Sequence, residues 1–505
     1  MRGVIGTVKF CKVADITDWQ DQEFQSISSL LGLDDFKDRK VWEHIQVYKG
    51  LLHLDLLMED ARSIGLGVGQ ERLIYAFANR CGEVIATDLY NSQNWQTAAM
   101  AVEEVYEKST FPYRRDRLTV RNMDMTQIDY PDASFDFVWS CCAIEHVNSF
   151  QDLHQVYREI HRVLKPGGIA ALTTEYNMTD HHSYEPNMLF TDRHWIRHWL
   201  TETNALLQGF ELVDLPDLEL ASDPGNEPQP RRTQLKSSIP IYSRDIILNS
   251  VSFFLRKTGD FSRSYDDEWL PHPLKLYLFA CDRQRNQDFA GSELIFKQLV
   301  DDATVEARLK VAALRRLVVS LRSQNKTDEL LEYCQQVIPL CNDAEDTDHL
   351  LPLANQCKKV GLWDEAHYLY EKIENLPGAR DVQVVRSVLG QAEYFAHLKQ
   401  FKTALTLADK AAQCLPIYRL TDEVGTVHYH RGLYNEKLGQ LNVAMEAYQS
   451  AIEASTTNAK LRDTCTQRFN HCYEALQQKP KHKSKVQRFK SWVNKLWNFA
   501  LTQKR

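Results

Sequence analysis

Three glycines and one acidic residue stand where they can bind a nucleotide-type cofactor. Gly65, Gly67 and Gly69 follow a short apolar run, and Asp88 ends the next apolar run along the chain. Glycine has no Cβ, so its backbone can lie directly against a ligand. A carboxylate at the end of the following strand can accept hydrogen bonds from both hydroxyls of a ribose. This spacing predicts a nucleotide cofactor, but by itself it does not say which one.

Short apolar runs alternate with amphipathic segments around these residues. We expect strands at residues 64–67, 83–87, 118–122, 135–140 and 169–174, and helices at 71–79, 97–108 and 149–164. Such alternation predicts a mainly parallel, doubly wound α/β sheet, whose ligands bind beyond the carboxyl ends of the strands. Two later strands, at 210–213 and 251–255, bracket a polar insertion and would close one edge of the sheet.

Further motifs narrow the class of cofactor. Asp124 follows the third strand, residues 144–147 (IEHV) follow the fourth, and residues 162–168 (RVLKPGG) precede the fifth. In this order, residues of about 40–257 resemble class I S-adenosylmethionine-dependent methyltransferases. Phrases such as FPYRRDRLTV and TTEY resemble, more narrowly, methyltransferases associated with bacterial surface-glycan biosynthesis.

The resemblance implies S-adenosyl-L-methionine as the cofactor and assigns the first motif to its parts. Gly65, Gly67 and Gly69 would pass beneath the methionine portion. Asp88 would hold the ribose, with Leu89 beside it in the cofactor site.

The resemblance also assigns the later motifs and exposes one departure. Asp124 and the backbone of Met125 would meet the adenine amino group, and Ser140 would line the floor of the site. The family usually has an acid two residues before the first glycine, where this chain has Ser63. Glu71, just past the turn, could supply the missing charge near the methionine ammonium.

Methyl transfer from a sulfonium needs an acceptor lone pair held in line with the methyl group in a dry pocket. A hydroxyl acceptor gains from a general base, for which His146 is the first candidate and Glu175 the second. We expect no metal site, because His194 and His198, four apart on a helix, lack a third ligand. We also expect no DNA substrate, because residues 140–143 (SCCA) lack the Pro-Pro-aromatic motif of amino-methylating DNA enzymes.

The second half of the chain changes to helices alone. Small or apolar residues recur at intervals of 36 to 40 residues, at Ala290, Leu330, Ala366, Ala404 and Ala444. This pattern resembles the tetratricopeptide repeat and predicts an all-α solenoid with a concave face for a protein partner. A generic helical bundle is the alternative.

These patterns divide the chain into five parts. They are an N-terminal helical cover or lid (1–58), the methyltransferase domain (59–257), a linker (258–272), the helical repeats (273–478) and a basic amphipathic tail (479–505). The tail carries nine Lys and Arg residues and no acid, although the whole chain has a net charge of −8. Such a tail can cap the solenoid, lie on an anionic membrane surface or bind another partner.

The cysteines and the N-terminus favour the cytoplasm. The eleven cysteines include no CxxC pair, which favours reduced thiols, and the first residues lack the order of a signal peptide. We therefore expect a cytoplasmic enzyme, peripheral at the inner face of the membrane if the tail binds there.

Three functions remain open. The first is O-methylation of a sugar, glycan or other small molecule, with the repeats docking a protein partner. The second is methylation of a protein that the repeats capture. The third is a repeat scaffold whose methyltransferase domain is degenerate.

Overall fold

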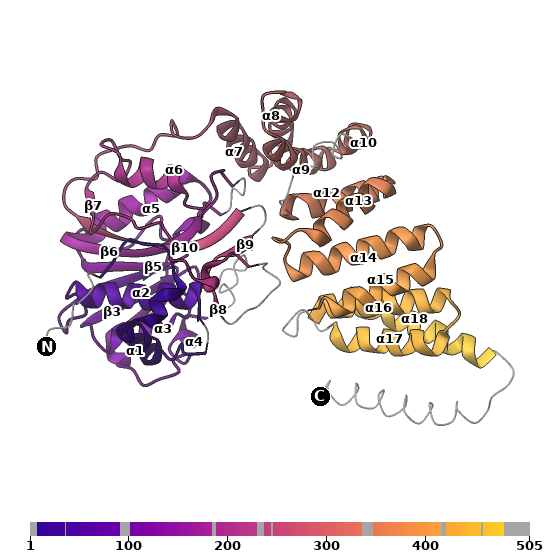
Figure 1. The fold of residues 1–505 in the computed structure, drawn as a ribbon, viewed down its shortest axis with the longest axis horizontal. Coiled ribbons are helices and arrows are strands. Elements are labelled where there is room, and N and C mark those ends of the chain that lie inside the picture. The colour runs from indigo at the N-terminus through magenta and orange to yellow at the C-terminus, as the bar shows by residue number, and fades with distance from the viewer. Residues whose placement is uncertain are drawn as a thin grey trace. The chain divides into compact units, whose positions relative to one another are not determined.

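The computed structural model describes residues 8–35, 37–90, 101–183, 188–229, 237–243, 246–335, 347–415, 421–455 and 458–478. The chain divides into two compact units, one of residues 1–365 with 375–380 and one of residues 366–374 with 381–505. The first unit contains a central sheet, and the described part of the second is helical (Figure 1).

One mixed sheet forms the centre of the first unit. In pairing order its strands are β4 (Leu118–Asn122), β3 (Glu83–Asp88), β2 (Arg62–Leu66), β5 (Phe135–Cys141), β6 (Leu164–Asn177), β10 (Ile246–Lys257) and β7 (Phe210–Leu212), with β9 (Ile241–Ser243) also on β10. The first five strands run parallel, and β10 is antiparallel to each of its neighbours. The predicted doubly wound sheet is confirmed. A separate two-stranded pair joins β1 (Lys37–Asp38) to β8 (Ser237–Ser238).

Helices cover both faces of the sheet, which is why its strands are continuous apolar runs. One face packs against α1 (Gln22–Leu31), α2 (Arg39–His53) and α3 (Arg72–Ala78), and the other against α5 (Phe150–Val163) and α6 (Arg193–Ile196). A short α4 (Val102–Val105) lies before β4. Trp139 of β5 is fully buried on the first face, and Val138 beside it is fully buried on the second.

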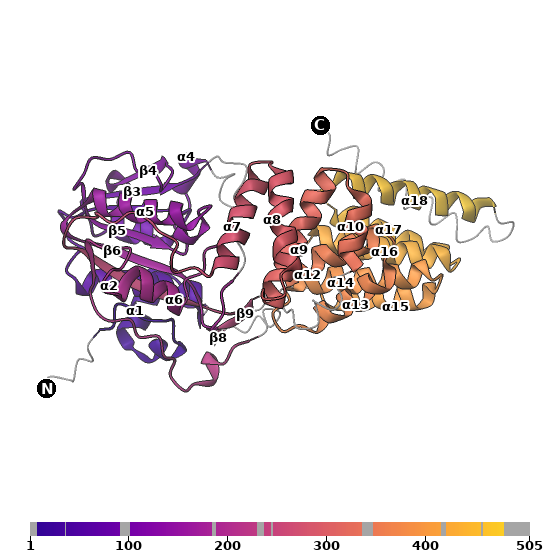
Figure 2. The same ribbon diagram turned by 90° about the horizontal axis from the view of Figure 1, so that it is seen from above.

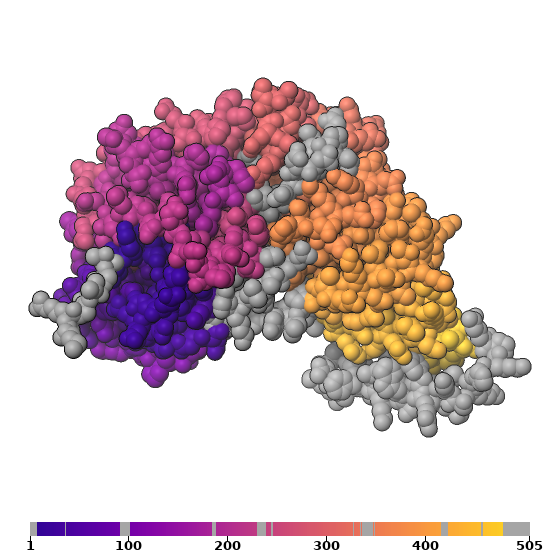
Figure 3. All heavy atoms as spheres, in the orientation of Figure 1, coloured from indigo at the N-terminus to yellow at the C-terminus, as the bar shows by residue number. Residues whose placement is uncertain are grey.

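The N-terminal cover contains α1 and α2, and an extended segment at residues 11–14 precedes them. Val13 bridges Val251 of β10, and the Ala14 N–H donates to the Ser250 carbonyl at 2.8 Å. The Asn249 side-chain amide donates to the Ala14 carbonyl at 3.0 Å. The cover is thereby hydrogen-bonded to the sheet, and Figure 3 shows its indigo residues as part of the surface of the first unit.

Two strands begin five residues earlier than the sequence predicts. The strand predicted at 169–174 is β6, which begins at Leu164 directly after α5, and the strand predicted at 251–255 is β10, which begins at Ile246. Gly167 has a φ of +79°, and the pairing of β5 with β6 shifts register between Phe135 and Phe137, which accommodates the Pro-Gly-Gly sequence. Part of the predicted helix at 97–108 lies outside the described residues.

The remaining described elements are helices. In the first unit they are α7 (His272–Arg285), α8 (Phe289–Asp301), α9 (Ala307–Ser323), α10 (Thr327–Gln335) and α12 (Thr347–Lys359). After them come α13 (Trp363–Asn375), where the chain passes between the units, and α14 (Asp381–His397), α15 (Phe401–Gln413), α16 (Thr421–Lys437), α17 (Leu441–Ala454) and α18 (Ala459–Gln478). From α14 to α18 each helix packs against the next (Figure 2). No helix among the described residues is long and apolar enough to cross a bilayer.

The small packing positions predicted from the sequence are mostly buried. Ala366, Ala404 and Ala444 are each at most 1% exposed, and Leu330 is also buried. Ala290 is an exception, since it lies on the exposed side of α8, and Ser292 is the small buried residue there. In α8 the buried small residue therefore lies two positions after the one that the sequence predicts.

Candidate active site

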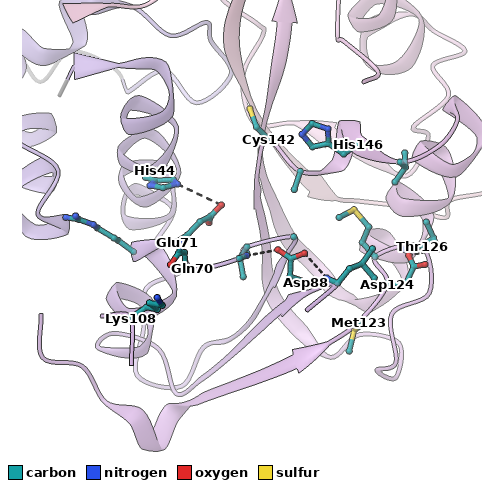
Figure 4. Close-up of a pocket in the computed structure, with 18 of the residues that line it drawn as sticks. His44, Gln70, Glu71, Asp88, Lys108, Met123, Asp124, Thr126, Cys142 and His146 are labelled. Carbon is teal, nitrogen blue, oxygen red and sulfur yellow. Dashed lines mark hydrogen bonds and ion pairs between the residues drawn. The ribbon is translucent and has the colours of Figure 1, made fainter. Parts of the chain in front are cut away.

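A pocket of about 890 Å³ opens at the carboxyl ends of β2, β3, β4 and β5 (Figure 4). Its walls come from the ends of these four strands and the segments that follow them, at residues 67–72, 88–89, 123–126, 142–143 and 146–148, with further residues at 33, 44, 108, 110 and 152. The volume lies within the range of cofactor and small-molecule sites. The pocket is therefore where a doubly wound sheet is expected to bind its ligand.

The turn after β2 brings backbone to the pocket wall. Gly67 and Gly69 line the pocket and have φ values of +64° and +48°, a left-handed conformation that favours glycine. A Cβ on Gly67 would lie 2.5 Å from the Cβ of Ala143, so a side chain there would close the cradle. Gly65 instead lies within β2 and is not among the lining residues. A Cβ on Gly65 would come within 2.3 Å of the Trp139 ring, so this glycine makes room for a core side chain.

Asp88 is locked in place by the same turn. Its Oδ2 accepts the Gly69 N–H at 2.8 Å, and its Oδ1 accepts the Leu89 N–H at 2.7 Å. The Tyr90 hydroxyl donates to the Gly69 carbonyl at 2.6 Å and so also stabilises the turn. Asp88 is buried and Leu89 is exposed, and both line the pocket. A carboxylate oxygen has more than one lone pair, so Asp88 can still accept hydrogen bonds from a ligand.

Asp124 and Met125 also line the pocket, on the side of β4. The Asp124 Oδ1 accepts both the N–H and the hydroxyl of Thr126, at 2.8 and 2.7 Å. Ser140 does not line the pocket. It is fully buried behind the turn, and its hydroxyl donates to the Leu66 carbonyl at 2.7 Å. Ser140 therefore supports the floor from beneath.

The position that lacks the usual acid can now be placed. Ser63 is fully buried in β2 and donates to the Glu83 carbonyl at 3.3 Å, away from the pocket. Gly67, not Gly65, is the first glycine of the turn with a left-handed conformation. Counted from Gly67, the position two residues earlier, where the family usually has an acid, is Gly65. The Trp139 ring occupies the space that an acidic side chain there would need.

Glu71 lines the pocket, and its carboxylate turns toward His44 of α2 (Figure 4). The Glu71 Oε1 lies 3.9 Å from the His44 Nε2. Burial, with a smaller contribution from the charge of Glu43, raises the pKa of Glu71 well above its usual range. Burial also lowers the pKa of His44 to about 4. Both side chains are therefore held toward their neutral forms.

The two candidate bases have different surroundings. His146 lies in a short 3-10 turn (Ile144–His146) after β5 and lines the pocket. Glu175 of β6 is not a lining residue and accepts from Arg39 of α2 at 2.7 Å. Burial favours the neutral form of Glu175, but Arg39 and Lys40 outweigh it and lower the pKa of this carboxyl. Since a strongly acidic carboxyl is a poor proton acceptor, the geometry favours His146.

A buried polar network behind the pocket escaped sequence analysis. The Glu43 Oε1 accepts from the Ser250 hydroxyl and, at 3.1 Å, from the Cys142 thiol, and it lies 3.5 Å from Arg39. Burial and the charge of Glu175 raise the pKa of the neighbouring Glu145. Arg39 and Glu43 are four residues apart on α2, but Cys142, Glu175 and Ser250 come from other elements, so no sequence spacing connects the whole network.

The two adjacent cysteines, Cys141 and Cys142, are both buried. Burial and the charge of neighbouring acids raise the pKa of the Cys141 and Cys142 thiols well above the usual range. Their thiolate forms are therefore disfavoured in the protein without ligands.

Comparisons with known proteins give the class of the domain. Residues 64–172 match the family model described as a methyltransferase domain. The chain is 34% identical over 109 residues to the 27-O-demethylrifamycin SV methyltransferase of Amycolatopsis mediterranei (22% of this chain, 36% of the relative). It is 42% identical over 67 residues to the sterol 24-C-methyltransferase of Eremothecium gossypii (13% of this chain, 17% of the relative). The matches thus span 36% and 17% of the length of these two curated relatives.

One solved structure is similar to the chain at lower identity. Phosphoethanolamine N-methyltransferase 2 of Haemonchus contortus, in complex with S-adenosyl-L-methionine, is 21% identical, with 37% of this chain and 43% of that chain covered and a TM-score of 0.26.

Residues 64–172 are a class I S-adenosylmethionine-dependent methyltransferase domain, the class that their order of motifs predicted. The methyl donor of this class of domain is S-adenosyl-L-methionine. The domain lies within a longer chain whose C-terminal part is helical.

Proposed function

We propose that the protein is an S-adenosylmethionine-dependent methyltransferase that methylates a hydroxyl of a sugar, glycan or other small molecule. The observation that carries this proposal is the pocket itself. A left-handed glycine turn and a locked carboxylate meet there at the ends of adjacent parallel strands, within the segment that matches methyltransferase domains.

The residues of the pocket fit the cofactor. The backbone at Gly67 and Gly69 leaves room for the methionine portion, Asp88 accepts from the ribose hydroxyls, and Asp124 with Met125 meets the adenine. Glu71 stays a predicted contact for the methionine end. When bound, the cofactor supplies a methyl group on a positively charged sulfur.

His146 is the residue that we assign to the acceptor. It lines the pocket at the end of β5, so it can hold an acceptor hydroxyl and take its proton during transfer. The relatives named above are methyltransferases of small molecules by their names, which supports a small-molecule acceptor. The phrases shared with surface-glycan enzymes favour a sugar among these.

A cofactor titration tests the proposal. Asp88→Ala removes the ribose contact, which we expect to weaken binding of S-adenosylhomocysteine by about 10- to 100-fold, the range for a lost charged hydrogen bond. Isothermal titration of the full-length protein measures it. Asp152→Asn, at another pocket acid, is the control and should bind within about threefold of wild type. Absence of binding by wild type would support the degenerate scaffold instead.

The helical region is proposed to dock a protein partner. The successive packing of α14 to α18, with small residues buried between helices, supports a stacked repeat of the tetratricopeptide kind. If the partner were the methyl acceptor, removal of residues 381–505 would abolish methylation of that protein. If the acceptor is a small molecule, turnover on it would survive the same truncation.

The basic tail lies outside the described residues, and its membrane role stays a prediction. We expect the tail to bind the cytoplasmic surface of a membrane, for which anionic vesicles are the test surface. Loss of residues 479–505 should then abolish vesicle binding, and unchanged binding would exclude the tail as the anchor.

A further inference from the structure

Three possible metal ligands from three separate elements meet beside the pocket. His44 comes from α2, Glu71 from the residue before α3, and Cys141 from the end of β5. One ligand atom from each lies within 4.8 Å of the other two. His44 and Glu71 also line the pocket, so the group is reachable from it.

The group contains a buried carboxylate oxygen that lacks a hydrogen bond. Among the described residues, the Oε2 of Glu71 is buried without a hydrogen-bond partner. A buried polar atom without a partner costs stability, so such an atom in a native structure calls for an explanation such as a bound ion. Here the atom belongs to a carboxyl group, and the other oxygen of that group lies beside the His44 Nε2.

We propose that His44, Glu71 and Cys141 form a binding site for a divalent metal ion of the zinc class. Imidazole nitrogen, carboxylate oxygen and thiolate sulfur are the three ligand types that zinc takes in proteins, and three protein ligands with one open position are typical of catalytic zinc. The nearby charge of Glu43 adds to the attraction for a cation, although Lys40 opposes it.

The distances allow a tetrahedral ion after small side-chain movements. Zinc bonds of about 2.0 to 2.3 Å place tetrahedral ligand atoms about 3.3 to 3.7 Å apart. The His44 Nε2 and Glu71 Oε1 are 3.9 Å apart, so they must approach by only a few tenths of an ångström. The longest separation in the group, at most 4.8 Å, requires a shift of about 1 Å.

The metal site would act on the methyl acceptor, and this part of the inference rests on the proposed methyltransferase function. Because His44 and Glu71 line the pocket, a metal that they hold would be within reach of an acceptor oxygen there and would make the acceptor's proton more acidic. His146, on the same pocket, would then accept that proton.

Cobalt(II) titration of the full-length, tag-free protein after chelator treatment tests the site. We expect one equivalent of cobalt to produce a thiolate-to-cobalt absorption band, and zinc to abolish the band and raise the melting temperature. Cys141→Ser should lose the band. His44→Gln and Glu71→Gln should weaken cobalt binding at least about 100-fold, which is more than the loss of a residue that only supports a metal ligand would cause. Cys142→Ser is the matched control and should keep the band, since Cys142 contacts Glu43 and is outside the group.

Two results would overturn the proposal. One is the absence of a band in wild type, and the other is a band that survives Cys141→Ser in a folded protein. In either case, Glu71 is assigned to the amino-acid portion of the cofactor if Glu71→Gln weakens binding of S-adenosylhomocysteine but not binding of 5′-methylthioadenosine, which lacks that portion. The Asp88→Ala titration needs no metal, so the proposed methyltransferase function can fail or hold independently.

Discussion

Arg39 neutralises two buried carboxylates behind the active site, and its removal should be costly. Its guanidinium lies 2.7 Å from the Glu175 Oε1 and 3.5 Å from the Glu43 Oε1. Arg39 is 9% exposed, Glu175 6% and Glu43 0%. Arg39→Met keeps the length of the side chain but leaves both acids in a low-dielectric interior without their main cation.

The magnitude follows from that burial. Breaking a buried ion pair by removing one partner costs about 3 to 5 kcal/mol, because the remaining charge is uncompensated. With a urea m-value of about 3 kcal/mol/M, the unfolding midpoint of the first unit should fall by roughly 1 to 1.7 M. The pKa of Glu175 is lowered in the folded protein, so the stabilisation is present above the ordinary carboxyl pKa and is lost as pH falls below it.

Urea unfolding followed by tryptophan fluorescence at pH 7 and pH 4 measures the effect. Lys40→Met is the control, because Lys40 lies 3.4 Å from the Glu43 Oε2 but its side chain is 49% exposed, so its loss should cost less than about 1 kcal/mol. The double variant Arg39→Met with Glu175→Leu should recover part of the lost stability. A midpoint shift below about 0.3 M for Arg39→Met, or an equal shift for Lys40→Met, would refute this account.

Two further predictions concern the same unit. Burial and the charge of Arg158 lower the pKa of His154 to about 4. The free energy of unfolding of wild type should therefore fall by on the order of 3 kcal/mol as pH decreases from about 6.5 toward 4, because the unfolded histidine takes up a proton first. In urea unfolding, His154→Phe should show less pH dependence over this range. Gly65→Ala places a Cβ 2.3 Å from the Trp139 ring and should cost about 1 to 3 kcal/mol and lower the melting temperature. Gly167→Ala meets no atom within 4 Å and should cost only the backbone strain of its positive φ, about 1 to 2 kcal/mol. A Gly65→Ala variant as stable as wild type would contradict the clash.

The sequence predicted those parts of the fold that local patterns determine. Apolar runs between turn residues located the parallel strands, because a strand covered on both faces shows its burial in its own composition. The motif glycines and Asp88 were found for the same reason, since a strand, a turn and the end of the next strand lie close together in the chain. Gly65 shows the limit of this reasoning, because its neighbour Trp139 belongs to another strand.

The sequence could not predict contacts that depend on how α2 packs against the sheet. Arg39 and Glu43 are buried and His44 is half-buried on α2, where an apolar pattern indicates burial but not the partners of polar residues. Their partners come from β5, β6, β10 and the start of α3, and only the folded chain brings them together. The expectation that there is no metal site rested on spacing motifs, and the three side chains proposed here share none.

The position of β10 between β6 and β7 determines when the domain can fold during synthesis. The extended segment at 11–14 is made well before β10, but it shares hydrogen bonds with Asn249 and Ser250 of that strand. Among the described strands, β7 likewise pairs only with β10, which is made after it. Such contacts between distant parts of the chain form slowly, because a long loop must close first. On the ribosome, the N-terminal segment must therefore wait for more than 200 residues before it reaches its place.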